Sequence, residues 1–137
     1  MSKKITVANT VNAGIKKTWD YYTQPKHITQ WNFADPSWAC PYASNNLQVG
    51  GKYMARMEAK DGSFGFDFGG KYTEVIDGEK LSFKLDDGRE VTASFNGDGN
   101  ATQVTVVFDA EDTNPVEMQK GGWQAILDNF KKYTEAN

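Results

Sequence analysis

Alternating apolar and polar residues dominate the middle of the chain and restrict its fold more than any other feature. From Gly51 onward apolar side chains recur at every second position, and Asp-Gly pairs interrupt the alternation at 61–62, 77–78 and 87–88. A period of two is typical of a strand with one buried face, and Asp-Gly between such runs is a strong hairpin signal. Residues 51–108 therefore predict a meander of five antiparallel strands with one apolar face.

Two other patterns flank this meander. Alternation over residues 5–11 predicts a strand before it, and apolar residues three or four apart predict two short helices that end near Trp31. After the meander, Asn114 and Pro115 mark the start of a long amphipathic helix over about 115–134. This helix is the only predicted element long enough to cover the apolar face. The sequence thus predicts an α+β fold, with a six-stranded antiparallel curved sheet, two short helices, and one long C-terminal helix across the concave face.

Three segments interrupt these regular patterns. Residues 32–46 include two prolines and are predicted to form a loop. Loops of this length inside a compact domain usually have a function. Gly69-Gly70 falls inside the longest predicted strand and indicates either a bulge or a close approach of another backbone. Gly121-Gly122 lies inside the long helix, where each glycine costs roughly 1 kcal/mol relative to alanine. That cost indicates either close packing or space left for another molecule.

Length and charge exclude several classes of function. A chain of 137 residues has the length of one domain, so we expect a single domain over 1–137. Fifteen basic and eighteen acidic residues give a net charge of −3, whereas nucleic-acid binders normally carry a basic face. No apolar run approaches the roughly 18 residues of a membrane span, and the N-terminus has no signal-peptide pattern. We expect a cytoplasmic protein with neither a nucleic-acid partner nor a membrane span.

Few residues are suited to catalysis or to metal binding. His27 is the single histidine and is expected to be exposed near a helix start, with no partner that the sequence can place. Cys40 is the single cysteine and is expected to be a small buried side chain. One histidine and one cysteine cannot form a clustered metal site. The glycine pairs match no phosphate-loop or dinucleotide pattern. We therefore expect no catalytic residue, no metal and no cofactor.

The order of elements and several short motifs resemble a known family. The motifs are Trp19, the PKHI at 25–28 before Trp31, the VGGKY at 49–53, the GKYTEV at 70–75, and the GGW at 121–123. Together they resemble the START/Bet v-like helix-grip superfamily over essentially the whole chain. The bacterial branch concerned is similar to the C-terminal domain of the activator of heat-shock-protein-90 ATPase. The resemblance implies that small apolar or aromatic molecules bind in a cavity between the sheet and the long helix.

Such a cavity would have mostly aromatic walls, because the chain contains eight Phe, six Tyr and four Trp. Strand parity and the apolar stripe of the last helix predict that its lining includes Trp31, Tyr53, Met57, Phe66, Phe68, Tyr72, Trp123, Ile126 and Phe130. Glu74 and Gln119 are added as polar candidates. Glu74 faces inward if the parity of Phe66 and Phe68 continues to it, and outward if the glycine pair shifts the register by one. Its orientation is left open.

Three functions follow from these features. Binding of a small, largely apolar or aromatic molecule agrees best with an aromatic cavity that has few polar groups. A cyclase or hydrolase would instead use an inward acid such as Glu74. A co-chaperone-like protein interaction would use the outer surface, although no sequence feature indicates the protein partner.

Overall fold

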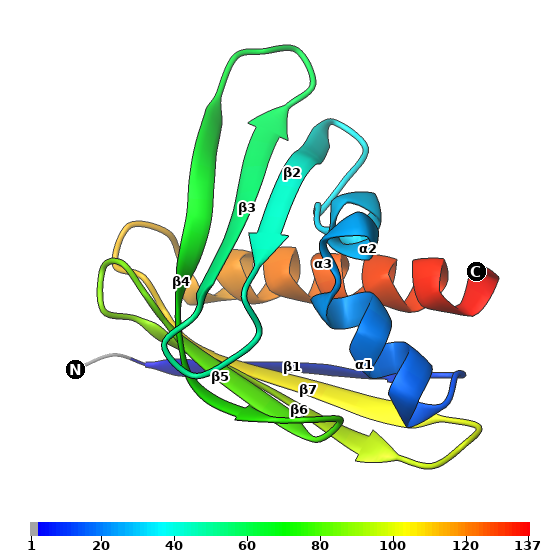
Figure 1. The fold of residues 1–137 in the computed structure, drawn as a ribbon. Helices are drawn as coiled ribbons and strands as arrows, with labels where there is room; N and C mark the ends of the chain where they lie inside the picture. Colours follow the sequence, from blue (N-terminus) through cyan, green and yellow to red (C-terminus); the bar gives the residue numbers. More distant parts are fainter. Residues whose placement is uncertain (1–2) are drawn as a thin grey trace.

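The computed structural model describes residues 3–137, which form one antiparallel sheet and three helices (Figure 1). The strands in these residues are β1 (Lys4–Val11), β2 (Trp38–Asn45), β3 (Lys52–Ala59), β4 (Gly65–Ile76), β5 (Lys80–Leu85), β6 (Glu90–Gly97) and β7 (Thr102–Asp109). The helices are α1 (Ile15–Thr23), α2 (Pro25–Trp31) and α3 (Val116–Ala136). The prediction of an α+β fold with a long C-terminal helix is confirmed, whereas the sheet has seven strands and not six.

The sheet is bent into two parts. Its strand order is β1-β7-β6-β5-β4-β3-β2. In Figure 1, β2, β3 and the first half of β4 stand up as an arm, while β5, β6, β7 and β1 form a floor. Helix α3 runs through the angle between the arm and the floor, and α1 and α2 lie at one end of that angle (Figure 1). The concave side of the sheet is therefore covered by helices along part of its length.

The seventh strand is β2, in a segment that the sequence predicted to be a loop. It pairs with β3 through Tyr42 and Arg56 and through Ala43 and Ala55, with an irregularity between Ala39 and Tyr42. Proline has no backbone N–H to donate to a neighbouring strand. It is therefore tolerated at sheet edges and bulges, where that hydrogen bond is not required. The strand forms at the edge of the sheet, where a proline and a broken register hide the period-two pattern.

Strand β4 belongs to both parts of the sheet, and its glycines lie where the two parts meet. Gly70 is paired with Tyr53 of β3 on one side and with Leu85 of β5 on the other. A Cβ atom on Gly70 would lie well inside van der Waals contact with the carbonyl oxygen of Lys84, and one on Gly69 would overlap that of Tyr53. The predicted close backbone approach is therefore confirmed at this corner.

Side chains of α3 and of β1 hold the helix along the floor. The amide of Asn9 donates to the Leu127 carbonyl at 3.0 Å, and that of Gln124 donates to the Ala8 carbonyl at 3.1 Å. No side chain lies within 4 Å of a Cβ built on Gly122, so close packing does not explain that glycine. Among residues 3–137, no helix is long and apolar enough to span a bilayer.

Candidate functional site

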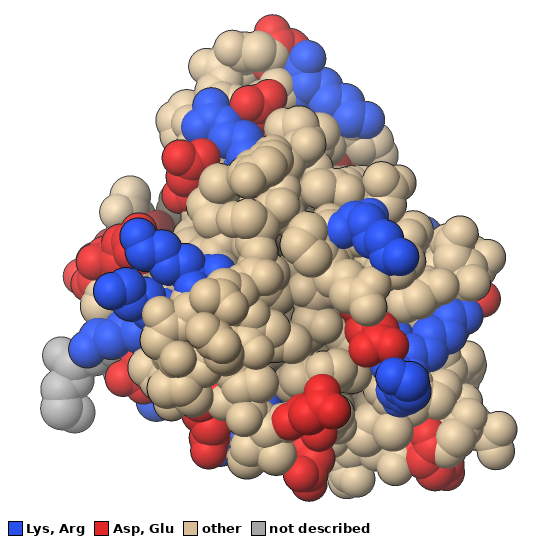
Figure 2. Space-filling view, in the orientation of Figure 1, with Lys and Arg blue, Asp and Glu red and all other residues tan. Residues whose placement is uncertain are grey.

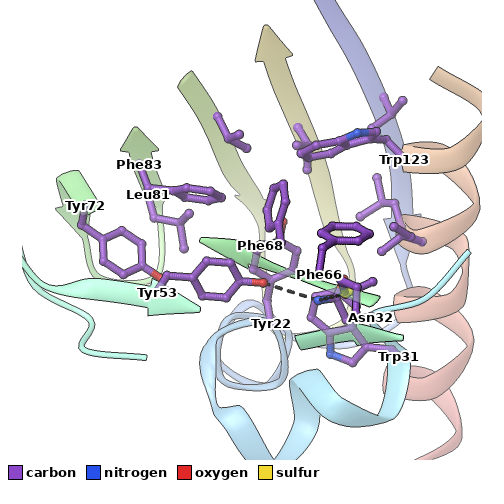
Figure 3. A pocket seen from close by; sticks show the side chains of 16 residues that line it. Tyr22, Trp31, Asn32, Tyr53, Phe66, Phe68, Tyr72, Leu81, Phe83 and Trp123 are labelled. Carbon is purple, nitrogen blue, oxygen red and sulfur yellow. Dashed lines mark hydrogen bonds between the residues drawn. The ribbon is translucent and has the colours of Figure 1, made fainter. Parts of the chain in front are cut away.

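A pocket of about 200 Å³ lies between the floor, the arm and α3 (Figure 3). Every strand except β2 contributes to its walls, and side chains at the ends of α1 and α2 close one end. The pocket is smaller than the roughly 300–1,000 Å³ of sites for drug-sized ligands. It is larger than an engineered cavity of about 150 Å³ that binds benzene. Its size therefore suits a molecule of about one ring.

Most of the residues predicted to line a cavity are brought together here. Eight of them line the pocket, namely Trp31, Tyr53, Met57, Phe66, Phe68, Tyr72, Trp123 and Ile126. Figure 3 shows Phe66, Phe68 and Trp123 on the side of α3, with Tyr53 and Tyr72 at the opposite side. The remaining predicted residues, Glu74, Gln119 and Phe130, lie elsewhere.

Glu74 lies outside the pocket because of a bulge in β4. Tyr72 is paired with Phe83, and Glu74 is paired with Ser82, so Thr73 is an extra residue that reverses the parity beyond it. The carboxylate of Glu74 is instead 3.0 Å from the ammonium group of Lys80, and both side chains are partly exposed. The inward orientation is thus wrong. Glu74 faces outward because of the register shift considered as the alternative, which occurs at Thr73, three residues after Gly70.

Gln119 and Phe130 have structural positions outside the lining. Gln119 fastens the segment before α3, since its amide donates to the Asn114 carbonyl at 2.7 Å and accepts from the Glu111 N–H at 2.9 Å. Phe130 is fully buried behind the pocket wall. Its ring packs against Tyr22 and Trp31 at centroid distances of 5.2 and 4.9 Å. Both of those rings do line the pocket.

Sequence reasoning missed half of the lining. The missed residues are Val7, Tyr22, Asn32, Leu81, Phe83, Val91, Val106 and Leu127. Those on the floor follow the period-two alternation, which predicts a buried face but does not distinguish a pocket wall from a filled core. Asn32 had no such signal, because it follows α2 in a segment without periodicity.

Asn32 is held rigidly at the C-terminal end of α2. Its backbone N–H donates to the Ile28 carbonyl at 3.1 Å. The amide of Asn129 on α3 donates to the carbonyls on both sides of it, at 3.1 Å to Trp31 and 3.4 Å to Phe33. The Asn32 side chain is buried at 7% exposure and lies against the arm. Two helices therefore fix one amide group at the end of an apolar pocket.

Three tyrosines, Tyr22, Tyr53 and Tyr72, lie in the pocket walls. The hydroxyl of Tyr72 donates to Oδ1 of Asn45 at 2.7 Å, and burial raises its pKa to about 12. Burial also raises the pKa of Tyr22 and that of Tyr53 above the usual value for a phenol. All three side chains are therefore neutral hydroxyl groups at physiological pH.

The pocket opens toward the arm, where aromatic rings are exposed. Phe66 lines the pocket and is also 40% exposed, and Phe64 beyond it is 61% exposed. Trp38 of β2 lies against both, with ring centroids 6.1 Å from Phe64 and 6.2 Å from Phe66. On the face shown in Figure 2, acidic and basic side chains are interspersed, and neither sign forms a continuous patch on that face.

His27 and Cys40 lie outside the pocket lining. Cys40 is buried as expected, and burial raises the pKa of its thiol. His27 is half-buried, so the expectation that it is exposed is wrong, and it has partners that the sequence could not place. Its ring stacks on Tyr21 at 3.8 Å between centroids, and its Nδ1 lies 2.7 Å from the hydroxyl of Tyr133. His27 therefore joins α2 to the last turns of α3.

This arrangement predicts a loss of stability in mild acid. Burial lowers the pKa of His27, and Lys26 lowers it further, while Asp20 opposes the shift. Because the folded pKa lies below the unfolded value of about 6.5, the unfolded chain binds more protons. The stabilisation is fully present above about pH 6.5 and is lost as the pH falls through and below it. Denaturant unfolding at about pH 7.5 and 5.5 should show a larger decrease for the native protein than for His27→Gln. Equal decreases would contradict the prediction.

Comparisons with known proteins agree with this architecture. The model of the family described as Activator of Hsp90 ATPase homolog 1-like protein matches residues 12–135. The solution structure of an AHSA1-like protein from Aeromonas hydrophila is similar to this chain with a TM-score of 0.90 and 42% identity. That similarity covers 98% of this chain and 93% of the other. A comparison with curated proteins finds no match.

Two further solved structures extend the likeness. A protein from Cytophaga hutchinsonii is 48% identical, with a TM-score of 0.83 over 98% of this chain and 93% of that one. A protein from Chromobacterium violaceum is 20% identical with a TM-score of 0.86 over 98% of both chains, which shows a common fold. With the family model matching nearly from end to end, the chain belongs to the Activator of Hsp90 ATPase homolog 1-like family, within the helix-grip superfamily.

Proposed function

We propose that this protein binds a small, largely apolar or aromatic molecule in the pocket between the sheet and α3. The observation that carries the proposal is the pocket itself, which is open to the surface at Phe66 and has walls made mainly of aromatic and aliphatic side chains. Ligand sites typically combine such walls with a few polar groups. The family resemblance supports the same function.

The enzyme alternative loses its main candidate residue. Glu74 is paired with Lys80 on the side of the sheet away from the pocket, so it cannot act on a molecule held inside. The protein-interaction alternative would use the exposed rings of Phe64 and Phe66 on the arm, together with the partly buried Trp38 against which they lie. The experiment below distinguishes it from ligand binding.

Toluene, a single ring with one methyl group, is a suitable first probe. A ligand that binds only the folded state at ten times its Kd stabilises that state by about 1.4 kcal/mol. For a chain of this length the shift in Tm is about 4 °C. We therefore expect toluene to raise the Tm, as measured by differential scanning calorimetry.

Two phenylalanine substitutions on β7 form a matched pair. Val106 lines the pocket, while Val104 is fully buried on the same strand and outside the lining. Val106→Phe should place its ring in the pocket and abolish the toluene shift. Val104→Phe should lower the free energy of unfolding by overpacking, typically by 1–3 kcal/mol, and so lower the Tm while it retains the toluene shift. If toluene leaves the native Tm unchanged, ligand binding is contradicted and interaction through the arm becomes the better explanation.

A further inference from the structure

The pocket contains no charged side chain. None of the sixteen lining residues in the described part of the chain is Asp, Glu, Lys, Arg or His. An ionised ligand would lose its water of hydration here without gaining a counter-charge, which is strongly unfavourable. The tyrosine hydroxyls cannot supply that charge, because burial keeps them protonated. The walls therefore select uncharged molecules.

The amide of Asn32 has hydrogen-bonding capacity that the protein does not fill. Its Nδ2 lies 3.5 Å from the Tyr53 hydroxyl, 3.6 Å from the Met57 sulfur and 3.9 Å from the Cys40 sulfur. Good N–H···O bonds are 2.7–3.2 Å long, and an amide offers two donors and two acceptor sites. A side chain that is 7% exposed normally has such partners. Asn32 lines the pocket, its one oxygen partner lies beyond that range, and its other two contacts are to sulfur atoms, which are weak acceptors.

Two hydroxyl groups in the same pocket are similarly available. Tyr53 accepts the long bond from Asn32, so its own hydrogen is free to be donated. The hydroxyl of Tyr22 makes no hydrogen bond to another group of residues 3–137. The hydroxyl of Tyr72 differs, because its hydrogen is donated to Asn45. Figure 3 shows Asn32 and Tyr53 pointing toward each other across one end of the pocket.

We infer that the ligand is an uncharged molecule of about one ring that carries a hydroxyl group, and that this hydroxyl binds beside Asn32 and Tyr53. A hydroxyl both donates and accepts, which matches an amide next to a phenol. The apolar remainder of the molecule lies against Phe68 and Trp123, whose rings meet at a centroid distance of 5.9 Å. This inference rests on the proposed function, and it names the chemistry that the site recognises.

Three probes that share one methylated ring test the inference. They are toluene, p-cresol and p-toluate, which differ in a hydrogen, a hydroxyl or a carboxylate at one position. We expect p-cresol to bind up to about tenfold more tightly than toluene, because a net hydrogen bond contributes about 1 kcal/mol. We expect p-toluate to bind about 100-fold more weakly or not at all at neutral pH. Dissociation constants are measured by chemical-shift titration of the labelled protein.

Variants then locate the hydroxyl. Asn32→Leu keeps the number and branching of the side-chain heavy atoms and removes the amide, so toluene should bind within about threefold of native while p-cresol weakens by up to about tenfold. Tyr53→Phe should weaken p-cresol by a smaller factor. Tyr42→Phe is the matched control, because Tyr42 is 55% exposed and lies outside the pocket lining, and the preference for p-cresol should remain. Toluene binding in each variant shows that the pocket persists.

The outcomes separate the inference from the proposed function. Toluene binding without a preference for p-cresol, or a preference unchanged in both Asn32→Leu and Tyr53→Phe, would overturn the inference and leave ligand binding intact. Binding of p-toluate as tight as that of p-cresol would overturn the selection for uncharged molecules. If no probe binds, the proposed function fails and the inference fails with it.

Discussion

Replacing Phe130 with alanine is expected to lower the free energy of unfolding by about 3–5 kcal/mol. Phe130 is fully buried on α3, at the point where the rings of Tyr22 and Trp31 meet it edge-on. Truncation removes the transfer free energy of the ring, the aromatic contacts, and the packing around the space left behind. Domains of this size have about 5–15 kcal/mol in total, so a large fraction would be lost. Urea unfolding monitored by circular dichroism measures the change.

A substitution on the same helix serves as the control. Met118 is 65% exposed on α3, and Met118→Ala should change the free energy of unfolding by no more than about 0.5 kcal/mol. The difference between the two variants isolates burial from helix propensity, since alanine is the replacement in both. A loss below about 1 kcal/mol for Phe130→Ala would contradict the close packing of α3 against the two short helices.

The floor of the sheet was predictable because its sequence pattern is strictly local. Leu81, Phe83 and Leu85 alternate with polar residues and are all buried, and the same holds for Val91, Ala93 and Phe95. Both strands lie in the floor of the sheet, where the helices cover one face. Period-two alternation then follows from burial alone. The Asp-Gly turns between the strands fix where each one ends.

Strand parity predicted the direction of side chains on the arm but not their burial. Phe66, Phe68 and Tyr72 point into the pocket as the alternation requires. Phe64 and Phe66 are nevertheless exposed, because the arm extends beyond the elements that cover it. A sequence pattern reports which face a residue shares with its neighbours, whereas burial also depends on what lies opposite. The exposed rings at the pocket opening are the consequence.

The remaining errors arise from pairings that a local pattern cannot show. Strand β2 is stabilised by its partner β3, while its own sequence contains a proline and no alternation. Glu74 is turned outward because Thr73 is an extra residue in the pairing of β4 with β5. Asn32 enters the pocket because α3 holds the carbonyls beside it. Each depends on contacts between distant segments, and these include the most specific features of the candidate site.

Gly70 lies at the corner of the sheet, where no space is left for a side chain. Gly70→Ala is expected to lower the free energy of unfolding by about 3 kcal/mol, at the upper end of the usual cost of overpacking. The added Cβ would overlap the Lys84 carbonyl on β5, and moving it away would separate β4 from a backbone with which it is hydrogen-bonded. The φ angle of Gly70 is not in the left-handed region, so the effect is one of space and not of backbone conformation.

Gly122→Ala provides a matched test with the opposite sign. Gly122 lies inside α3, and no atom outside its own stretch of helix is within 4 Å of its built Cβ, so alanine should fit and raise stability by up to about 1 kcal/mol. Both variants add the same methyl group, and unfolding in urea compares them directly. If Gly70→Ala were neutral, the two halves of the sheet would not approach as closely as the structure shows. The bend at this corner places Phe68 and Tyr72 opposite α3, so Gly70→Ala should also weaken toluene binding, whereas Gly122→Ala should leave it unchanged.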